Sequence, residues 1–128
     1  MKYLSNYTED GMSEVMKKHG AFFAFGKNQF DEQKKEGVRY YSLHAGMLCP
    51  QDNFEAMQKD LRGVIKNGIA QDIAENGIEN IIKRELSNHE AYYTGDVDST
   101  WSALTDYEGI TRESVIATFL EEKTTVVL

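Results

Sequence analysis

The residues of this chain that are most capable of chemistry lie together in "NHEAYYTGDVD", residues 88–98. The segment contains one histidine, His89, and three carboxylates, Glu90, Asp96 and Asp98. Imidazole nitrogen and carboxylate oxygen are common ligands of zinc, and a glutamate beside a bound zinc can act as a general base. These four residues are therefore a candidate metal site, either of a metal-binding module or of a small metal-assisted hydrolase.

The spacing of this segment is incomplete for the metal motifs that it resembles. "HEAYY" begins like the zinc motif H-E-x-x-H, but Tyr93 stands where the second histidine is needed. "DVDSTWS" alternates oxygen ligands like the start of a calcium loop. Trp101 and Tyr107 occupy the positions where that loop needs glycine and a bidentate glutamate. The metal hypothesis is therefore the alternative and not the main interpretation.

A structural role accounts for the same residues. At about 100° per residue, a helix that starts near residue 78 places His89 in its apolar band, which predicts a partly buried core histidine. The band consists of Ile78, Ile82 and Leu86. Gly95 then turns the chain, and Asp96 or Asp98 is expected to cap the next helix, where a carboxylate also complements the helix dipole. The segment is predicted to be a corner between two helices.

No other motif predicts catalysis or a cofactor. Gly26-Lys27 lacks both the glycine five positions earlier and the Ser or Thr that a phosphate-binding loop requires. Cys49 is the only cysteine, which excludes a disulfide framework and a multi-cysteine zinc site within the chain. A reactive pair with His44 is a minor alternative, and a small buried residue is the expected role of this cysteine.

The excess negative charge is confined to the last third of the sequence. Residues 1–84 contain 12 Lys+Arg and 12 Asp+Glu, whereas residues 85–128 contain 2 Lys+Arg and 9 Asp+Glu, which gives the whole net charge of −7. Nucleic-acid binding needs clustered lysine and arginine, so this region is not expected to bind it. A basic protein partner would suit it, and solubility alone is the simpler explanation. The candidate partner-binding residues are Glu90, Tyr92, Tyr93, Asp96, Asp98, Asp106 and Glu108.

Hydrophobic periodicity predicts an α+β domain over residues 1–128, with a small, mainly antiparallel sheet and about five or six helices. Strands are expected at 21–25, 38–43 and 47–49, the first of them buried. Helices are expected from a cap at Thr8 to Gly20, from Asn28 to Gly37 and from Pro50 to a stop at 66–68. A short helical turn with Ile69 and Ile73 is expected to run to a break at 75–77. Further helices are expected from Ile78 to Tyr93, at 97–107, and at 112–122 after a cap at Thr111. The last helix is predicted to bury Val115, Ile116, Phe119 and Leu120, and the tail 124–128 to add an edge strand or to trail.

Two motifs add a family resemblance. "GAFFAFGKNQFDEQ", residues 20–33, and "IIKRELSNHEAYYTGD", residues 81–96, resemble a family of small uncharacterised proteins of phages, prophages and other mobile elements that carries a domain-of-unknown-function label. The similarity extends from about residue 15 to residue 120. It implies a genomic setting, and it transfers no catalytic residue.

The main functional hypothesis is a non-enzymatic, cytoplasmic protein that binds a host protein. Its sharpest form is an inhibitor of a host defence nuclease, of the anti-CRISPR type, whose acidic last third meets a basic site. A further hypothesis is a homo-oligomer built on the aromatic pairs Tyr40-Tyr41 and Tyr92-Tyr93. The sequence shows neither a signal peptide nor a membrane span.

Overall fold

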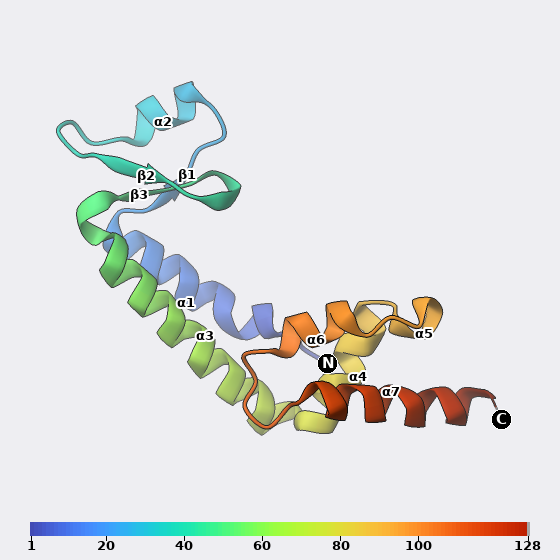
Figure 1. Ribbon diagram of the computed structural model, residues 1–128. Coiled ribbons are helices and arrows are strands. Elements are labelled where there is room, and N and C mark those ends of the chain that lie inside the picture. Colours follow the sequence, from blue (N-terminus) through green and yellow to red (C-terminus); the bar gives the residue numbers. More distant parts are fainter. Residues whose placement is uncertain (128) are drawn as a thin grey trace. The chain divides into compact units, whose positions relative to one another are not determined.

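The computed structural model describes the backbone of residues 1–127 and the side chains of residues 1–122 (Figure 1). The fold is α+β, as predicted: the described residues form seven helices and one three-stranded antiparallel sheet. In chain order the elements are α1 (Leu4–His19), β1 (Phe22–Phe23), α2 (Lys27–Gln33), β2 (Tyr40–Ser42), the 3₁₀ turn η1 (His44–Gly46), β3 (Met47–Pro50), the 3₁₀ turn η2 (Gln51–Asn53), α3 (Phe54–Asn76), α4 (Ile78–Asn88), α5 (Ala91–Thr94), α6 (Asp98–Leu104) and α7 (Arg112–Val127).

The contacts divide the chain into two compact units. The N-terminal unit comprises Leu4–Gly68, and the C-terminal unit comprises Ile69–Leu128 together with Met1–Tyr3. Helix α3 continues through the boundary between them. The single domain expected from the length of the chain stays a prediction.

The sheet of the N-terminal unit has the strand order β1-β3-β2, with Phe22 opposite Leu48 and Tyr41 opposite Cys49. The central strand β3 buries Cys49 completely. Strand β1 lies at the edge, so the prediction that segment 21–25 is buried is wrong: Phe23 is 46% and Phe25 77% exposed. An edge strand has a neighbour on one side only, and this one has too few residues around it to cover every ring.

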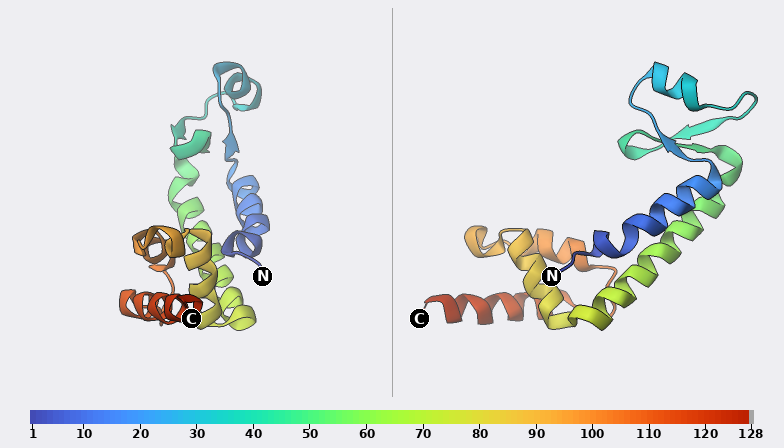
Figure 2. Two further views of the ribbon diagram at one scale, coloured as in Figure 1. Left: turned by 90° about the vertical axis from the view of Figure 1, so that its right-hand side faces the viewer. Right: turned by 180° about the vertical axis from the view of Figure 1, so that it is seen from behind.

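Helices α1 and the first part of α3 run side by side below the sheet (Figure 2). Glycines allow their close approach. A Cβ atom at Gly68 would lie 2.5 Å from Thr8 Cγ2, and one at Gly11 would lie 3.0 Å from Val64 Cγ1. The predicted helix stop at 66–68 is therefore wrong, because Gly68 is a packing residue inside α3 and not the end of a helix. The predicted cap at Thr8 is also wrong, since Thr8 is buried within α1.

Two predicted helix breaks are confirmed. Gly20 has φ +73°, and the hydrogen bonds from Gly20 N to Lys17 O and from Ala21 N to Met16 O close the end of α1 in the Schellman pattern. Gly77 has φ +78° and separates α3 from α4 within the C-terminal unit. Both positions use the left-handed backbone conformation that glycine adopts without steric cost.

The C-terminal unit packs α4 against α5, α6 and α7. Its fully buried apolar side chains include Ile81, Leu86 and Val115. The predicted cap of the last helix is confirmed, because Thr111 Oγ1 accepts the N–H of Ser114 and Ser114 Oγ accepts the N–H of Thr111. The prediction that α7 buries its apolar residues is wrong for Leu120, which is 54% exposed.

The C-terminal edge strand predicted from the β-prone tail is wrong for residues 124–127, because α7 continues to Val127. Residue 128 lies outside the described residues. Local β propensity is a weak preference here and yields to a helix that has already started.

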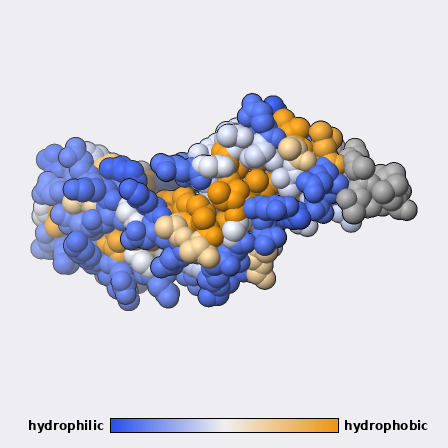
Figure 3. All heavy atoms as spheres, turned by 90° about the horizontal axis from the view of Figure 1, so that it is seen from below, coloured by the Kyte–Doolittle hydropathy of each residue, from blue (hydrophilic) through white to orange (hydrophobic). Residues whose placement is uncertain are grey.

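No helix among the described residues combines the length and the hydropathy that crossing a bilayer requires. The face in Figure 3 is mostly hydrophilic, with its apolar atoms gathered in separate patches.

Candidate protein-interaction surface

The predicted corner between helices lies at residues 88–98, but it is sharper than expected. Helix α4 ends at Asn88, His89 is its C-cap, and Glu90 adopts a left-handed conformation with φ 57° before the short helix α5. Gly95 then turns the chain with φ 74°. The predicted continuous helix to Tyr93 is therefore interrupted at His89 and Glu90. A glutamate in the left-handed region is uncommon and marks a backbone that its surroundings hold in place.

The histidine of this corner is half-buried at the end of α4, as its place in the apolar band predicted. The more deeply buried histidine is His19, whose Nε2 lies 2.7 Å from Asp60 Oδ2. His19 follows Met12, Val15 and Met16 at helical spacing in the sequence, and this apolar stripe was the signal for its burial. The partner carboxylate, 41 residues away in α3, had no signal in the sequence.

The metal hypothesis for His89, Glu90, Asp96 and Asp98 is not supported by their placement. Among the described residues, no three His, Cys, Asp or Glu side chains form a group that could hold a metal ion. Asp96 Oδ1 instead accepts the N–H of Asp98, the first residue of α6, at 2.8 Å. Asp98 Oδ1 accepts a hydrogen bond from Arg112 at 3.0 Å. Asp96 thus accepts one N–H at the start of α6, but the predicted N-cap is wrong, because Val97 occupies the N-cap position and Asp98 is already inside the helix.

The two neighbouring tyrosines have opposite environments. Tyr92 is half-buried and stacks on Phe119 of α7, with 5.8 Å between the ring centroids. Burial, with the Glu122 carboxylate nearby, raises the pKa of its phenol above the ordinary value. Tyr93 is 93% exposed. The stacked ring fixes α5 against α7, and the exposed ring extends from that fixed backbone.

The remaining candidates lie in the turns around α6. Asp106 and Glu108 are exposed in the turn between α6 and α7. Both α5 and α6 contact α4 and α7. The corner at residues 88–98 and the turn between α6 and α7 are therefore parts of one packed unit. We define the acidic corner as the exposed members of the predicted set: Glu90, Tyr93, Asp96, Asp98, Asp106 and Glu108.

A buried polar network lies in the core of the same unit. The guanidinium of Arg84 donates to both carboxylate oxygens of Asp72, at 2.8 and 3.0 Å, and to Glu85 at 3.1 Å. Tyr107 donates its phenol proton to Asp72 Oδ2 at 2.6 Å. Arg84 also donates to the carbonyl of Lys2 at 3.0 Å. Among the described residues, every buried side-chain nitrogen and oxygen has a hydrogen-bond partner.

The hydrogen bonds of this network decide its protonation. Burial alone would raise the pKa of the Asp72 carboxyl, but donors on Arg84, Tyr107 and Asn76 outweigh it and lower that pKa. Burial, together with the hydrogen bond to Asp72, raises the pKa of the Tyr107 phenol. The network is therefore held as a charged pair with a neutral tyrosine. Its groups are fully engaged with one another, which is the arrangement of a structural site.

Sequence reasoning missed this network. Asp72 lies three positions after Ile69, and Arg84 lies three positions after Ile81, so each charge shares a helix face with a buried apolar residue. A charge on such a face needs a buried partner of opposite sign, which was the available signal, but the sequence does not show which residue is the partner.

The boundary between the units also divides the charge. The N-terminal unit contains 9 Asp+Glu and 9 Lys+Arg, whereas the C-terminal unit contains 12 Asp+Glu and 5 Lys+Arg. The C-terminal unit therefore holds the whole net charge of −7. Two of its carboxylates, Asp72 and Glu85, are buried against Arg84, so the remaining excess lies toward its surface.

The lone cysteine is not poised for nucleophilic chemistry. Cys49 is fully buried, and burial raises the pKa of its thiol, which disfavours the reactive thiolate. His44, the alternative partner, is exposed in η1.

Comparison with known proteins identifies the family alone. No curated protein and no solved structure matches the chain. The resemblance to a domain of unknown function is confirmed, since one family model covers residues 4–122, both units included. The chain belongs to this family, DUF7659, which is described as a family of unknown function.

Proposed function

We propose that this protein is a non-enzymatic binding protein that acts on another protein through the acidic corner of its C-terminal unit. The observation on which the proposal depends is that the net charge of −7 lies wholly in this compact unit, while the N-terminal unit is neutral. An acidic field of this kind speeds association with a basic surface and selects against acidic ones.

The geometry of the corner supports a protein partner over a small ligand. Tyr93 is 93% exposed, and tyrosine is among the residues that contribute most to binding at protein interfaces. It extends from a backbone that is fixed by the left-handed Glu90 and Gly95 and by the stacking of Tyr92 on Phe119. An anchor on an ordered backbone loses less conformational entropy on binding than one on a flexible loop.

The sharpest form of the proposal names a nucleic-acid-binding nuclease of a bacterial host as the partner. Its basic channel binds phosphates, and exposed carboxylates such as Asp96, Asp106 and Glu108 can take their place. This form includes expression from a phage or another mobile element and action in the host cytoplasm. The physical support for this form is the negative charge of the C-terminal unit and the exposed side chain of Tyr93.

The test is capture of a partner from a bacterial lysate at increasing salt. We expect binding that weakens as salt rises, and that is lost in a triple variant with Glu90→Gln, Asp96→Asn and Asp98→Asn. The matched control removes three exposed carboxylates from the neutral unit, with Glu9→Gln, Asp10→Asn and Glu14→Gln. It should bind like the unmodified chain.

The nuclease form has its own measurement. Duplex DNA should compete with the protein for the captured partner, and the chain should slow DNA cleavage by that partner. Binding that is indifferent to salt, or lost equally in the control variant, would contradict the proposal as a whole. Salt-sensitive binding without competition by DNA would contradict the nuclease form alone.

A further inference from the structure

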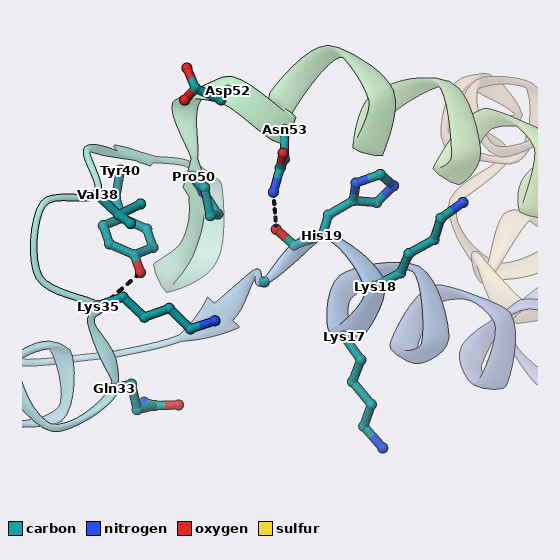
Figure 4. A pocket seen from close by; sticks show the side chains of 11 residues that line it. Lys17, Lys18, His19, Gln33, Lys35, Val38, Tyr40, Pro50, Asp52 and Asn53 are labelled. Carbon is teal, nitrogen blue, oxygen red and sulfur yellow. Dashed lines mark hydrogen bonds between the residues drawn. The ribbon is translucent and has the colours of Figure 1, made fainter.

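The N-terminal unit contains a pocket of about 340 Å³, and we propose that this pocket binds a small phosphate monoester (Figure 4). Its walls come from the end of α1, the segment between α2 and β2, the end of β3, and η2. The volume lies at the lower end of the roughly 300–1,000 Å³ that small-molecule sites span. The pocket shares no residue with the acidic corner, so this proposal is independent of the proposed function.

The lining of the pocket is basic. It includes three lysines and one histidine, and its only carboxylate is Asp52. Two of the basic groups already have a partner, because Lys18 Nζ lies 3.2 Å and His19 Nε2 2.7 Å from Asp60 Oδ2. Lys17 and Lys35 are exposed and form no ion pair within the described part of the chain. Two ammonium groups are thus available to an anion.

These two lysines belong to different walls. Figure 4 shows Lys17 extending from the end of α1 and Lys35 extending from the segment that follows α2. A cation in the last turn of α1 complements the negative end of that helix, which accounts for Lys17. It does not account for Lys35 on the other wall. In Figure 4 the Lys17 side chain extends away from Lys35, so a bound dianion would draw this exposed, flexible side chain toward the Lys35 ammonium.

The pocket also offers a neutral donor. The phenol oxygen of Tyr40 accepts the backbone N–H of Lys35 at 3.1 Å, which leaves the phenol proton available to a ligand oxygen. The Tyr40 ring is held edge-on by Phe22 and Phe30, with centroids 5.4 and 5.7 Å away. On the other side, Asn53 donates to the carbonyl of His19 at 3.0 Å and ties η2 to the end of α1. Both walls are therefore fixed before a ligand arrives.

An apolar surface adjoins these polar groups. Val38 and Pro50 line the pocket beside the Tyr40 ring. Inorganic phosphate would bind through the lysine ammonium groups alone. A monoester with a small ring could also bury the apolar side chains of Val38 and Pro50. This combination favours a phosphate monoester over the free ion.

Calorimetric titration of the full chain tests the proposal with three probes: inorganic phosphate, phenyl phosphate and phenol. We expect phenyl phosphate to bind more tightly than phosphate, and phenol not to bind. Lys17→Gln and Lys35→Gln should each weaken the binding of phenyl phosphate about tenfold or more, because each variant loses a charge-assisted hydrogen bond to the phosphate. Both lysines are exposed, so the variants should keep the melting temperature of the unmodified chain.

Lys34→Gln is the matched control. Lys34 is next to Lys35 in sequence but pairs with Asp31 at 3.3 Å and does not line the pocket. It should leave phenyl phosphate binding within about twofold. No detectable binding of phenyl phosphate at millimolar concentration would overturn the proposal. An equal loss in Lys34→Gln and Lys35→Gln would also overturn it, since that result means attraction to the overall charge.

Discussion

The main ion pairs of the two units differ in how deeply they are buried. In the C-terminal unit the ion pair of Asp72 and Arg84 is almost completely buried, with exposed side-chain fractions of 0% and 4%, and further donors and acceptors surround it. In the N-terminal unit the corresponding cluster of Lys18, His19 and Asp60 leaves the carboxylate 34% exposed. Water can replace a lost partner in the second cluster and cannot do so in the first. The acidic unit should therefore depend on its ion pair far more than the neutral unit does.

The largest expected effect is the loss of Arg84. Arg84→Met removes every partner charge from Asp72 and leaves a buried carboxylate, which should lower the free energy of unfolding by about 3–5 kcal/mol. Trp101, the only tryptophan, lies in the C-terminal unit, so its fluorescence during urea denaturation reports on that unit. The control is Arg112→Met, because the pair of Arg112 with Asp98 is 51% and 70% exposed. Arg112→Met should lower the free energy of unfolding by less than about 1 kcal/mol. Equal losses in the two variants would contradict the comparison.

The N-terminal unit should respond more to backbone packing than to charge. Gly68→Ala places a Cβ 2.5 Å from Thr8 Cγ2, which should cost about 1–3 kcal/mol despite the better helix propensity of alanine. Gly63→Ala is the matched control in the same helix, since nothing lies within 4 Å of its Cβ position. That variant should gain up to about 1 kcal/mol. Hydrogen exchange of the α1 amides is the measurement, and a gain in both variants would show that α1 and α3 are not in close contact there.

Gly68 shows which features of the fold could be predicted from the sequence and which could not. Local patterns predicted the class of the fold, the strand segments near 21–49 and the cap at Thr111, because these depend on residues close together in the chain. Gly68 was interpreted as a helix stop, since the sequence does not show that Thr8, 60 positions earlier, packs against it. The network of Asp72, Arg84 and Tyr107 was missed for the same reason. Contacts between distant segments are set by tertiary packing, which local patterns do not encode.

The pH dependence of stability should differ between the unmodified chain and the variant Asp72→Asn. The folded-state pKa of Asp72 lies below its unfolded value, so its contribution is fully present above the ordinary carboxyl pKa of about 4 and is lost as pH falls below it. We expect the free energy of unfolding, followed by Trp101 fluorescence, to fall between about pH 5 and pH 3. In Asp72→Asn this part of the decline should be absent. A decline of unchanged size in that variant would assign the acid sensitivity to other carboxylates.

The smallest effect on stability is expected at Tyr93. This side chain is 93% exposed, so Tyr93→Ala should change the free energy of unfolding by less than about 0.5 kcal/mol. Its neighbour is the control, because Tyr92→Ala removes the stacking on Phe119 and should cost about 1 kcal/mol or more. If Tyr93 anchors a partner, Tyr93→Ala should abolish capture while the protein stays as stable as the unmodified chain. Unchanged capture at unchanged stability would remove Tyr93 from the acidic corner and leave the carboxylates as its only binding groups.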